Sequence, residues 1–315
     1  IMALSGSFNY TLNRDQLIKN ALVDAQVIND TQTPSATMIV YCADSLNRML
    51  KAWQMDGLHL WVHNEVTLFL VTDQIKYLLG PSGDHATESY VETAIRTAAV
   101  SGATTLEVDS TTGITAADYI GIEQADGTMK WTTVSSVTDS DTLVIASALS
   151  DASAVDNVIF AYTTKIQRPL RITSAHYRTH AGNDRDLNII ARKDYWDISQ
   201  KTSEGEPNSV LFIPMLTNAE LRIWQEPDEV TDIVKMICQT PFDDMDAAAD
   251  NFRFPNEALD AIHWNLAYRL AVGYRSPPDV RQSLKDMAKE SKRQFLDFDV
   301  EIGPTYIQPD AQWLS

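Results

Sequence analysis

Two glutamates separated by a single glycine, Glu204 and Glu206, are the carboxylate pair in this sequence that could do acid–base chemistry. Glycoside hydrolysis needs one carboxylic acid and one carboxylate about 5–10 Å apart across the scissile bond. A working pair would make the chain a peptidoglycan hydrolase with one of these glutamates as the acid. Both lie in a stretch rich in Ser, Gly and Pro, which is typical of an exposed loop. We therefore expect solvated side chains here and no catalytic pair.

Histidine and aspartate residues give two further candidate sites, both for metal ions. His176 and His180 are four residues apart in a segment that we expect to be a strand, and zinc would need further ligands at known spacings. Four aspartates after residue 242 are spaced like a calcium loop, but the central Gly and the closing Glu of such a loop are missing. We predict no bound metal and no cofactor. The four aspartates are Asp243, Asp244, Asp246 and Asp250.

Motifs for nucleotide binding or nucleophilic catalysis do not occur in the sequence. There is no phosphate-binding glycine loop, no GxSxG turn and no HExxH helix. The two cysteines, Cys42 and Cys238, lie far apart among apolar residues, which is typical of buried, reduced thiols. We predict that the chain is not an enzyme.

A basic stripe is the clearest charge pattern. Arg281, Lys285, Lys289 and Arg293 recur at every fourth position, with Lys292 adjoining, and residues four apart are neighbours on a helix surface. The stripe is either a solvated face, partly neutralised by acids of the same helix, or a docking face for an acidic partner, with nucleic acid as a third reading. The neutralising acids would be Asp286 and Glu290.

The last residues, 300–315, combine apolar side chains with prolines that prevent a single helix. Such an extended apolar tail packs either on its own domain or on a neighbour's surface. Four of its residues are candidate partner-binding positions. These are Tyr306, Ile307, Trp313 and Leu314.

The chain is strongly acidic, with 43 Asp and Glu residues against 25 Lys and Arg residues and a net charge of −18. A protein that grips duplex DNA normally carries a basic stripe or groove, whereas an acidic lining suits a channel through which DNA passes. An apolar content of 44% is ample for a core. We recognise no signal peptide and no membrane span, so we expect synthesis in the cytoplasm and no membrane.

Helices are predicted at both ends of the sequence. Asn13 and Gln16 form a capping-box pattern before an amphipathic stretch, and Pro34 with the following Ser precedes a second helix that ends near residue 56. Further helices are expected after Pro255 and from Pro277 to about residue 298. Strands occupy the middle, rich in β-branched and aromatic residues. The expected strands are 60–62, 66–71, 74–79, 170–177, 187–191, 209–214, 220–224 and 233–239, with one or two helical turns at 192–198.

Residues 85–164 differ in composition from both flanks. They are rich in Thr, Ala, Ser, Val and Asp, and from residue 91 on they contain ten acidic residues against two basic ones. Asp126-Gly127 is a tight hairpin signal between two alternating stretches. We predict an α+β fold: a bundle of the N- and C-terminal helices packed with a β-sandwich-like middle, interrupted by a small all-β domain. Residues 1–84 and 165–315 would form one discontinuous host domain, 85–164 the insert, and 300–315 the tail.

Several stretches of the host portions together resemble the head-to-tail adaptor proteins of short-tailed bacteriophages (podoviruses), of the tail accessory factor or tail tubular protein A type. The resemblance extends over the host portions, about half of the chain, and rests on patterns of packing residues. The insert is similar to a module found in many phage virion proteins. The matching stretches are SLNRMLKAW (45–53), DGL (56–58), LFLV (68–71), RPLRI (168–172), FPNEAL (254–259) and NLA (265–267).

The resemblance implies a structural protein of the virion neck, made in the host bacterial cytoplasm. It implies a homo-oligomeric ring, a dodecamer, clamped between the portal protein and the tail nozzle protein, with the C-terminal tail reaching up the portal. The genome would pass through the ring without sequence-specific binding, and the insert would mount a tail fibre protein. The alternative is a peptidoglycan hydrolase associated with the phage tail.

Overall fold

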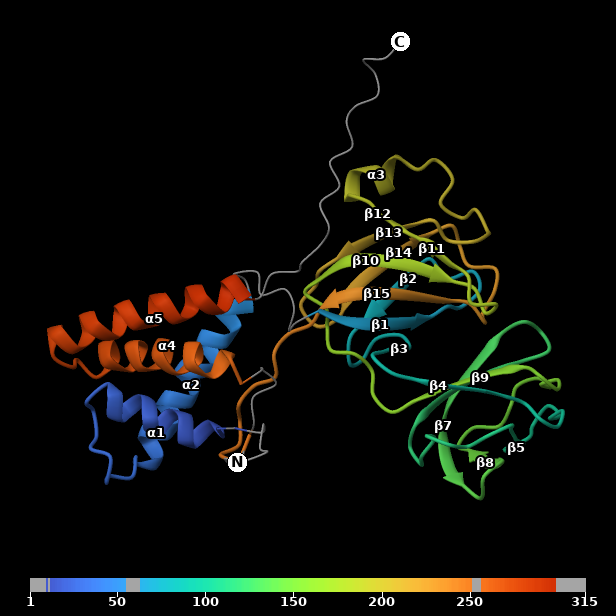
Figure 1. Cartoon of the computed structure of the whole chain (residues 1–315). Coiled ribbons are helices and arrows are strands. Elements are labelled where there is room, and N and C mark those ends of the chain that lie inside the picture. The colour runs from blue at the N-terminus through green and yellow to red at the C-terminus, as the bar shows by residue number, and fades with distance from the viewer. Residues whose placement is uncertain (1–9, 11, 55–62, 251–255, 299–315) are drawn as a thin grey trace, which may run out of the picture. The chain divides into compact units, whose positions relative to one another are not determined.

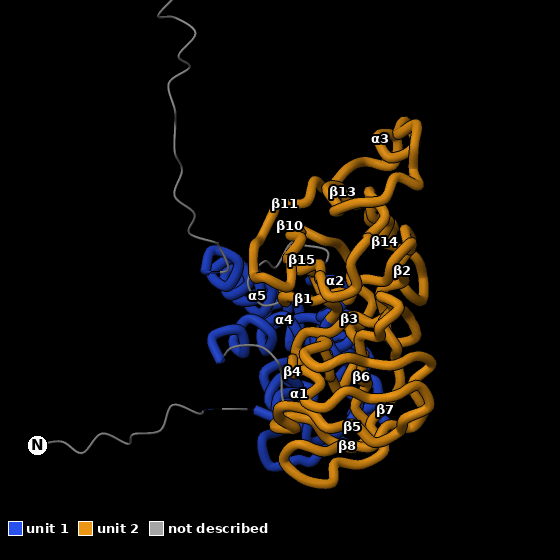
Figure 2. Tube along the Cα trace, turned by 90° about the vertical axis from the view of Figure 1, so that its right-hand side faces the viewer, with its two compact units in different colours: residues 1–62, 242–315 blue, residues 63–241 orange. Residues whose placement is uncertain are grey.

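The computed structural model describes residues 10, 12–54, 63–250 and 256–298, and shows a mixed α+β protein (Figure 1). The chain divides into two compact units (Figure 2). The helical unit comprises residues 1–62 and 242–315, and the β unit comprises residues 63–241. Helices from the two ends of the chain thus share one unit, and the strands between them, insert included, form the other.

The described residues of the helical unit form four helices: α1 (Arg14–Asp24), α2 (Ala36–Trp53), α4 (Ala258–Gly273) and α5 (Pro278–Phe298). The predicted capping box is confirmed, because Asn13 Oδ1 accepts from the Gln16 amide at 2.9 Å and Gln16 Oε1 accepts from the Asn13 amide at 3.2 Å. Ser35 Oγ caps α2 by accepting from the Met38 amide at 3.3 Å. These contacts satisfy amide groups that a helix start leaves without a partner.

All four helices contribute to one apolar core. Leu17, Leu46 and Leu266 have no exposed surface, and Trp53 stacks on Phe295 with ring centroids 6.3 Å apart. Each large apolar side chain that is fully buried contributes roughly 1.5–3 kcal/mol to stability. This core fixes α4 and α5 side by side, with the polar face of α5 directed away from it.

Two sheets surround the main core of the β unit. Along β10, inward and outward residues alternate as expected for a half-buried strand, apart from a bulge at Thr173. The first sheet has the order β11-β10-β15-β1-β3, with β1 (His63–Phe69), β3 (Ala86–Thr87), β10 (Arg171–Arg178), β11 (Asp184–Asp186) and β15 (Ile233–Gln239). The second has the order β12-β13-β14-β2, with β2 (Lys76–Leu79), β12 (Asn188–Ile189), β13 (Ser209–Ile213) and β14 (Ala219–Trp224).

The insert folds as a third, six-stranded antiparallel sheet with an apolar core of its own. Gly127 has a φ of 77°, as the predicted hairpin turn requires. At Gly121 a Cβ atom would lie 2.8 Å from the Trp131 ring, so glycine allows the indole to lie flat on the strand. The order is β4-β9-β6-β7-β8-β5, with β4 (Val91–Ala94), β5 (Thr105–Glu107), β6 (Tyr119–Glu123), β7 (Met129–Val137), β8 (Thr142–Ile145) and β9 (Val158–Tyr162).

Most strands match the sequence expectations to within a few residues, and the expected helical turn is α3 (Arg192–Asp197). The expected strand at 187–191 is reduced to the two residues of β12, and β11 was not expected. The expected strand at 60–62 lies outside the described residues. The first two residues after His85 belong to β3, which pairs with β1 of the host. In the described ranges, no helix is both long and apolar enough to cross a membrane.

Candidate interaction surfaces

The basic stripe lies on one flank of α5, next to the residues that anchor this helix. Leu284, Ala288 and Phe295 face the core at helical spacing. Lys285, Lys289 and Arg293 are exposed, as predicted for a surface stripe, while Arg281 is half-buried. The Nε atom of Arg281 is buried and has no hydrogen-bond partner in the described part of the chain. The solvent-facing part of the stripe is therefore Lys285, Lys289 and Arg293.

Acids of α5 neutralise only part of this stripe. Arg293 pairs with Glu290 at 2.9 Å, which raises the pKa of the guanidinium and lowers the pKa of the carboxyl group. Asp286 instead accepts from the side-chain amide of Gln282 at 3.1 and 3.2 Å. Over residues 10, 12–54, 63–250 and 256–298, Lys285 and Lys289 have no ion partner within 4 Å. Among the described residues, these two lysines of α5 are therefore exposed charges without an ion partner.

Lys292, next to the stripe, has a different role. Its Nζ atom lies 5.3 Å from the centroid of the Trp53 ring. A cation over an indole face is attracted by the ring quadrupole, so Lys292 covers the core instead of extending the stripe. The four tail candidates, Tyr306, Ile307, Trp313 and Leu314, lie outside the described residues.

The other side of α5 borders an acidic groove shared with α4, of about 340 Å³. Trp264 donates to Asp260 at 3.0 Å, which fixes its indole on the groove wall. Met287 is 42% exposed and supplies apolar surface. The groove is lined by Asp260, Trp264, Asp286, Met287, Glu290, Ser291 and Gln294. It combines carboxylates with apolar surface, as sites for amphipathic cationic side chains do. The sequence pattern indicated its two α5 acids, Asp286 and Glu290, only as charges that neutralise the stripe.

The two candidate carboxylates of the β unit are exposed. Glu206 Oε2 accepts from Arg185 Nη1 at 2.6 Å, and Arg185 also donates to the Pro207 carbonyl, so this glutamate belongs to an ion pair that fixes the loop. Glu204 forms an isolated backbone bridge with Glu226. Neither carboxylate has a contact typical of an acid–base pair.

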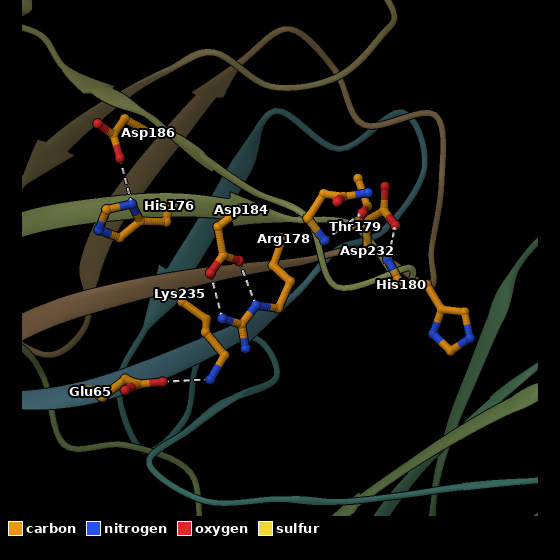
Figure 3. A network of polar contacts seen from close by, with 10 residues as sticks. Glu65, His176, Arg178, Thr179, His180, Asp184, Asp186, Asp232 and Lys235 are labelled. Atoms are coloured by element: carbon orange, nitrogen blue, oxygen red, sulfur yellow. Dashed lines mark hydrogen bonds and ion pairs between the residues drawn. The ribbon is translucent and has the colours of Figure 1, made fainter.

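The two histidines with candidate metal spacing are held by different partners (Figure 3). His176 Nδ1 lies 2.8 Å from Asp186 Oδ1, whereas the His180 ring points away and lies 3.5 Å from Glu92 of the insert. The surrounding charges pair across strands, Arg178 with Asp184 and Lys235 with Glu65, each at 2.5 Å. Among the described residues, no group of three or more His, Cys, Asp or Glu side chains could hold a metal ion.

A buried carboxylate supports the turn between β10 and β11. Asp232 accepts a hydrogen bond from the Tyr177 hydroxyl. It also accepts from the His180 amide at 2.8 Å (Figure 3). Burial, followed by the contact with Asp232, raises the pKa of Tyr177. The phenol therefore stays protonated and donates, which satisfies both buried groups.

The remaining sequence candidates have structural roles. Burial raises the pKa of the Cys42 thiol to about 11 and that of the Cys238 thiol to about 12, so both stay protonated. Asp244 pairs with Lys51 at 2.9 Å, and Asp250 accepts from the Ala247 amide at 2.7 Å. These aspartates stabilise a connector, as solvated acids of a turn do.

An aromatic junction, which no pattern in the sequence predicted, joins the insert to the host sheet. Phe69 of β1 lies 4.9 Å from Phe160 and 5.2 Å from Trp131, measured between ring centroids. His85 stacks on Trp131 at 3.8 Å and its Nδ1 lies 2.7 Å from the Tyr162 hydroxyl. Burial, followed by the nearby Lys165, lowers the pKa of His85 to about 3. The junction comprises Phe69, Tyr90, Tyr119, Met129, Trp131, Val158, Phe160, Tyr162 and Ile233.

This junction means that the insert is fixed to its host and is not a module on a free linker. The only hint in the sequence was a set of aromatic residues on both sides of the insert boundary. No protein-family model matches the chain, and no curated protein matches it significantly. The case for a function therefore rests on the surfaces themselves.

Proposed function

We propose that this chain is a structural assembly protein, a head-to-tail adaptor that joins portal and tail nozzle in the neck of a short-tailed phage. The observation that carries the proposal is the pair of unpaired cations on α5. Lys285 and Lys289 are exposed and have no ion partner in the described residues of a chain with a net charge of −18. Free charges on a rigid helix attract an acidic protein surface and orient it on approach.

In this proposal the helices from both ends form a bundle that makes the body of a homo-oligomeric ring, a dodecamer. The shared core of α1, α2, α4 and α5 supports this part, because it gives the ring a rigid wall. The genome passes through the ring without sequence-specific contacts, which the acidic composition supports. The protein is made in the bacterial cytoplasm and is carried in the virion.

The insert then mounts a tail fibre. Its attachment through the aromatic junction supports this role, because a mount must transmit load to the body that holds it. The insert's charge also favours it: ten acidic residues against two basic ones from residue 91 to 164 make a surface that suits a basic partner.

The proposal predicts that the C-terminal tail is needed for binding to the portal. A chain without residues 300–315 should fold normally but bind the portal protein at least tenfold more weakly, because the apolar tail docks on the partner. Sizing chromatography and electron microscopy of the full-length chain mixed with portal should show a ring-bearing complex. The proposal is contradicted if the full-length chain forms no such complex. If the truncated chain binds portal as tightly as the full-length chain, the tail has no part in the binding.

A further inference from the structure

The two sides of α5 carry opposite charges at the same spacing. Lys285 and Lys289 form a lysine ladder, and Asp286 and Glu290 form an acid ladder. Residues four apart on a helix lie about 5–6 Å apart, so both ladders have the same rise. Each acid follows its lysine by one residue, which turns it by about 100° around the helix axis. The ladders therefore occupy separate flanks of the exposed face.

Each ladder is suited to its counterpart on another molecule. The lysine ladder has no ion partner in the described residues. In the acid ladder, Glu290 pairs with Arg293, and Asp286 accepts only from the neutral side-chain amide of Gln282, so its charge is not neutralised by a cation there. The acid ladder borders the acidic groove, where Asp260 adds a third carboxylate and Trp264 an aromatic wall. A lysine entering the groove would place its ammonium between carboxylates and its methylene stem against Trp264 and Met287.

We infer that the acidic groove of one copy receives the lysine ladder of a second copy. This inference rests on the proposed function, to which it adds the contact between ring subunits. Because the two surfaces lie on different flanks of one helix, a molecule that uses its groove keeps its lysine ladder free for the next molecule. Such a contact is heterologous and propagates into a ring or a chain of subunits.

Charge reversal tests this contact with two variants of the full chain. Lys285→Glu/Lys289→Glu makes both flanks acidic, and Asp286→Lys/Glu290→Lys makes both basic. Each variant alone should associate on the order of a hundredfold more weakly than the wild type, because like charges then face each other. An equal mixture should recover association, since each variant supplies the charge that the other lacks. Sedimentation velocity at low ionic strength measures the association of the wild type, of each variant alone and of the mixture.

A matched control separates the contact from net charge. Arg192→Glu/Lys193→Glu changes the charge by the same amount as the lysine-ladder variant, on exposed residues of α3, and should associate like the wild type. Circular dichroism checks that each variant keeps its helices, and the milder Lys285→Gln/Lys289→Gln should weaken association to a lesser degree. Recovery in the mixture requires both variants to be folded.

The inference is overturned if the ladder variants associate like the wild type, if their mixture does not recover, if recovery stops at dimers, or if the wild type stays monomeric at every concentration. Failure of the proposed function has a different signature. In that case the ladder variants can still show loss and recovery of self-association, while the wild-type chain forms no complex with portal. Self-association and portal binding are measured separately, so failure of the subunit contact can be told apart from failure of the proposed function.

Discussion

Replacing Phe69 with Ala is expected to lower the free energy of unfolding of the β unit by about 3–5 kcal/mol. The Phe69 ring is 1% exposed and contacts four aromatic rings of the insert at centroid distances of 4.9 to 5.7 Å. Its removal leaves a cavity between two sheets that are joined covalently only by short connections on either side of the insert. Chemical denaturation followed by tryptophan fluorescence measures the loss, because Trp131 lies in the junction.

The same substitution at an exposed position provides the control. Phe298 is 58% exposed, so Phe298→Ala should change stability by less than about 0.5 kcal/mol. Hydrogen exchange should show where the Phe69→Ala chain opens first: at the edge strands β3 and β4 beside the junction, with the separate core of the insert sheet still protected. A Phe69→Ala chain as stable as the Phe298→Ala chain would mean that the aromatic junction does not hold the insert.

The second large effect is a dependence of stability on pH that comes from His85. Burial lowers its pKa from 6.5 to about 3 in the folded chain. Above pH 6.5 His85 is neutral in both the folded and unfolded states and contributes no pH dependence. As the pH falls from 6.5 towards 3, the unfolded state binds a proton that the folded state does not, so the folded state loses stability across this window.

The substitution His85→Phe removes the imidazole that binds a proton in the unfolded state, and it keeps a flat ring that can stack on Trp131. Between pH 6.5 and 3 the free energy of unfolding of the variant should fall less steeply than that of the wild type, and above pH 6.5 the two curves should run parallel. Denaturation curves over this range measure the difference, and carboxylates common to both chains cancel from it. Parallel curves throughout would show that His85 is not held neutral at the junction.

Local signals predicted the helices and the turns well. The capping box at Asn13 and the turn at Asp126-Gly127 depend on residues within four positions of each other, and both are present. The stripe on α5 could also be predicted, because helical spacing alone places charges on one face. Its partial neutralisation by Glu290 follows from the same local rule.

Contacts between distant segments could not be read in this way. Phe69 contacts Phe160 only because β1 and β9 come together in space. The hydrophobic periodicity of neither strand indicates this contact. The pairing of Ala86 and Thr87 with β1 was missed for the same reason, since two residues carry no alternation. The acidic groove requires the placement of α4 beside α5, because Asp260 and Trp264 join Glu290 only there.

The direct test of the assembly account is an electron microscopic reconstruction of the neck of the virion whose genome encodes this chain. The account predicts a ring of copies of this chain between portal and tail nozzle, in which α4 and α5 are part of the ring wall. Density for residues 91–162 should project from the ring as one body fixed to the neighbouring host sheet. A neck built from other chains, or a particle without this chain, would contradict the account.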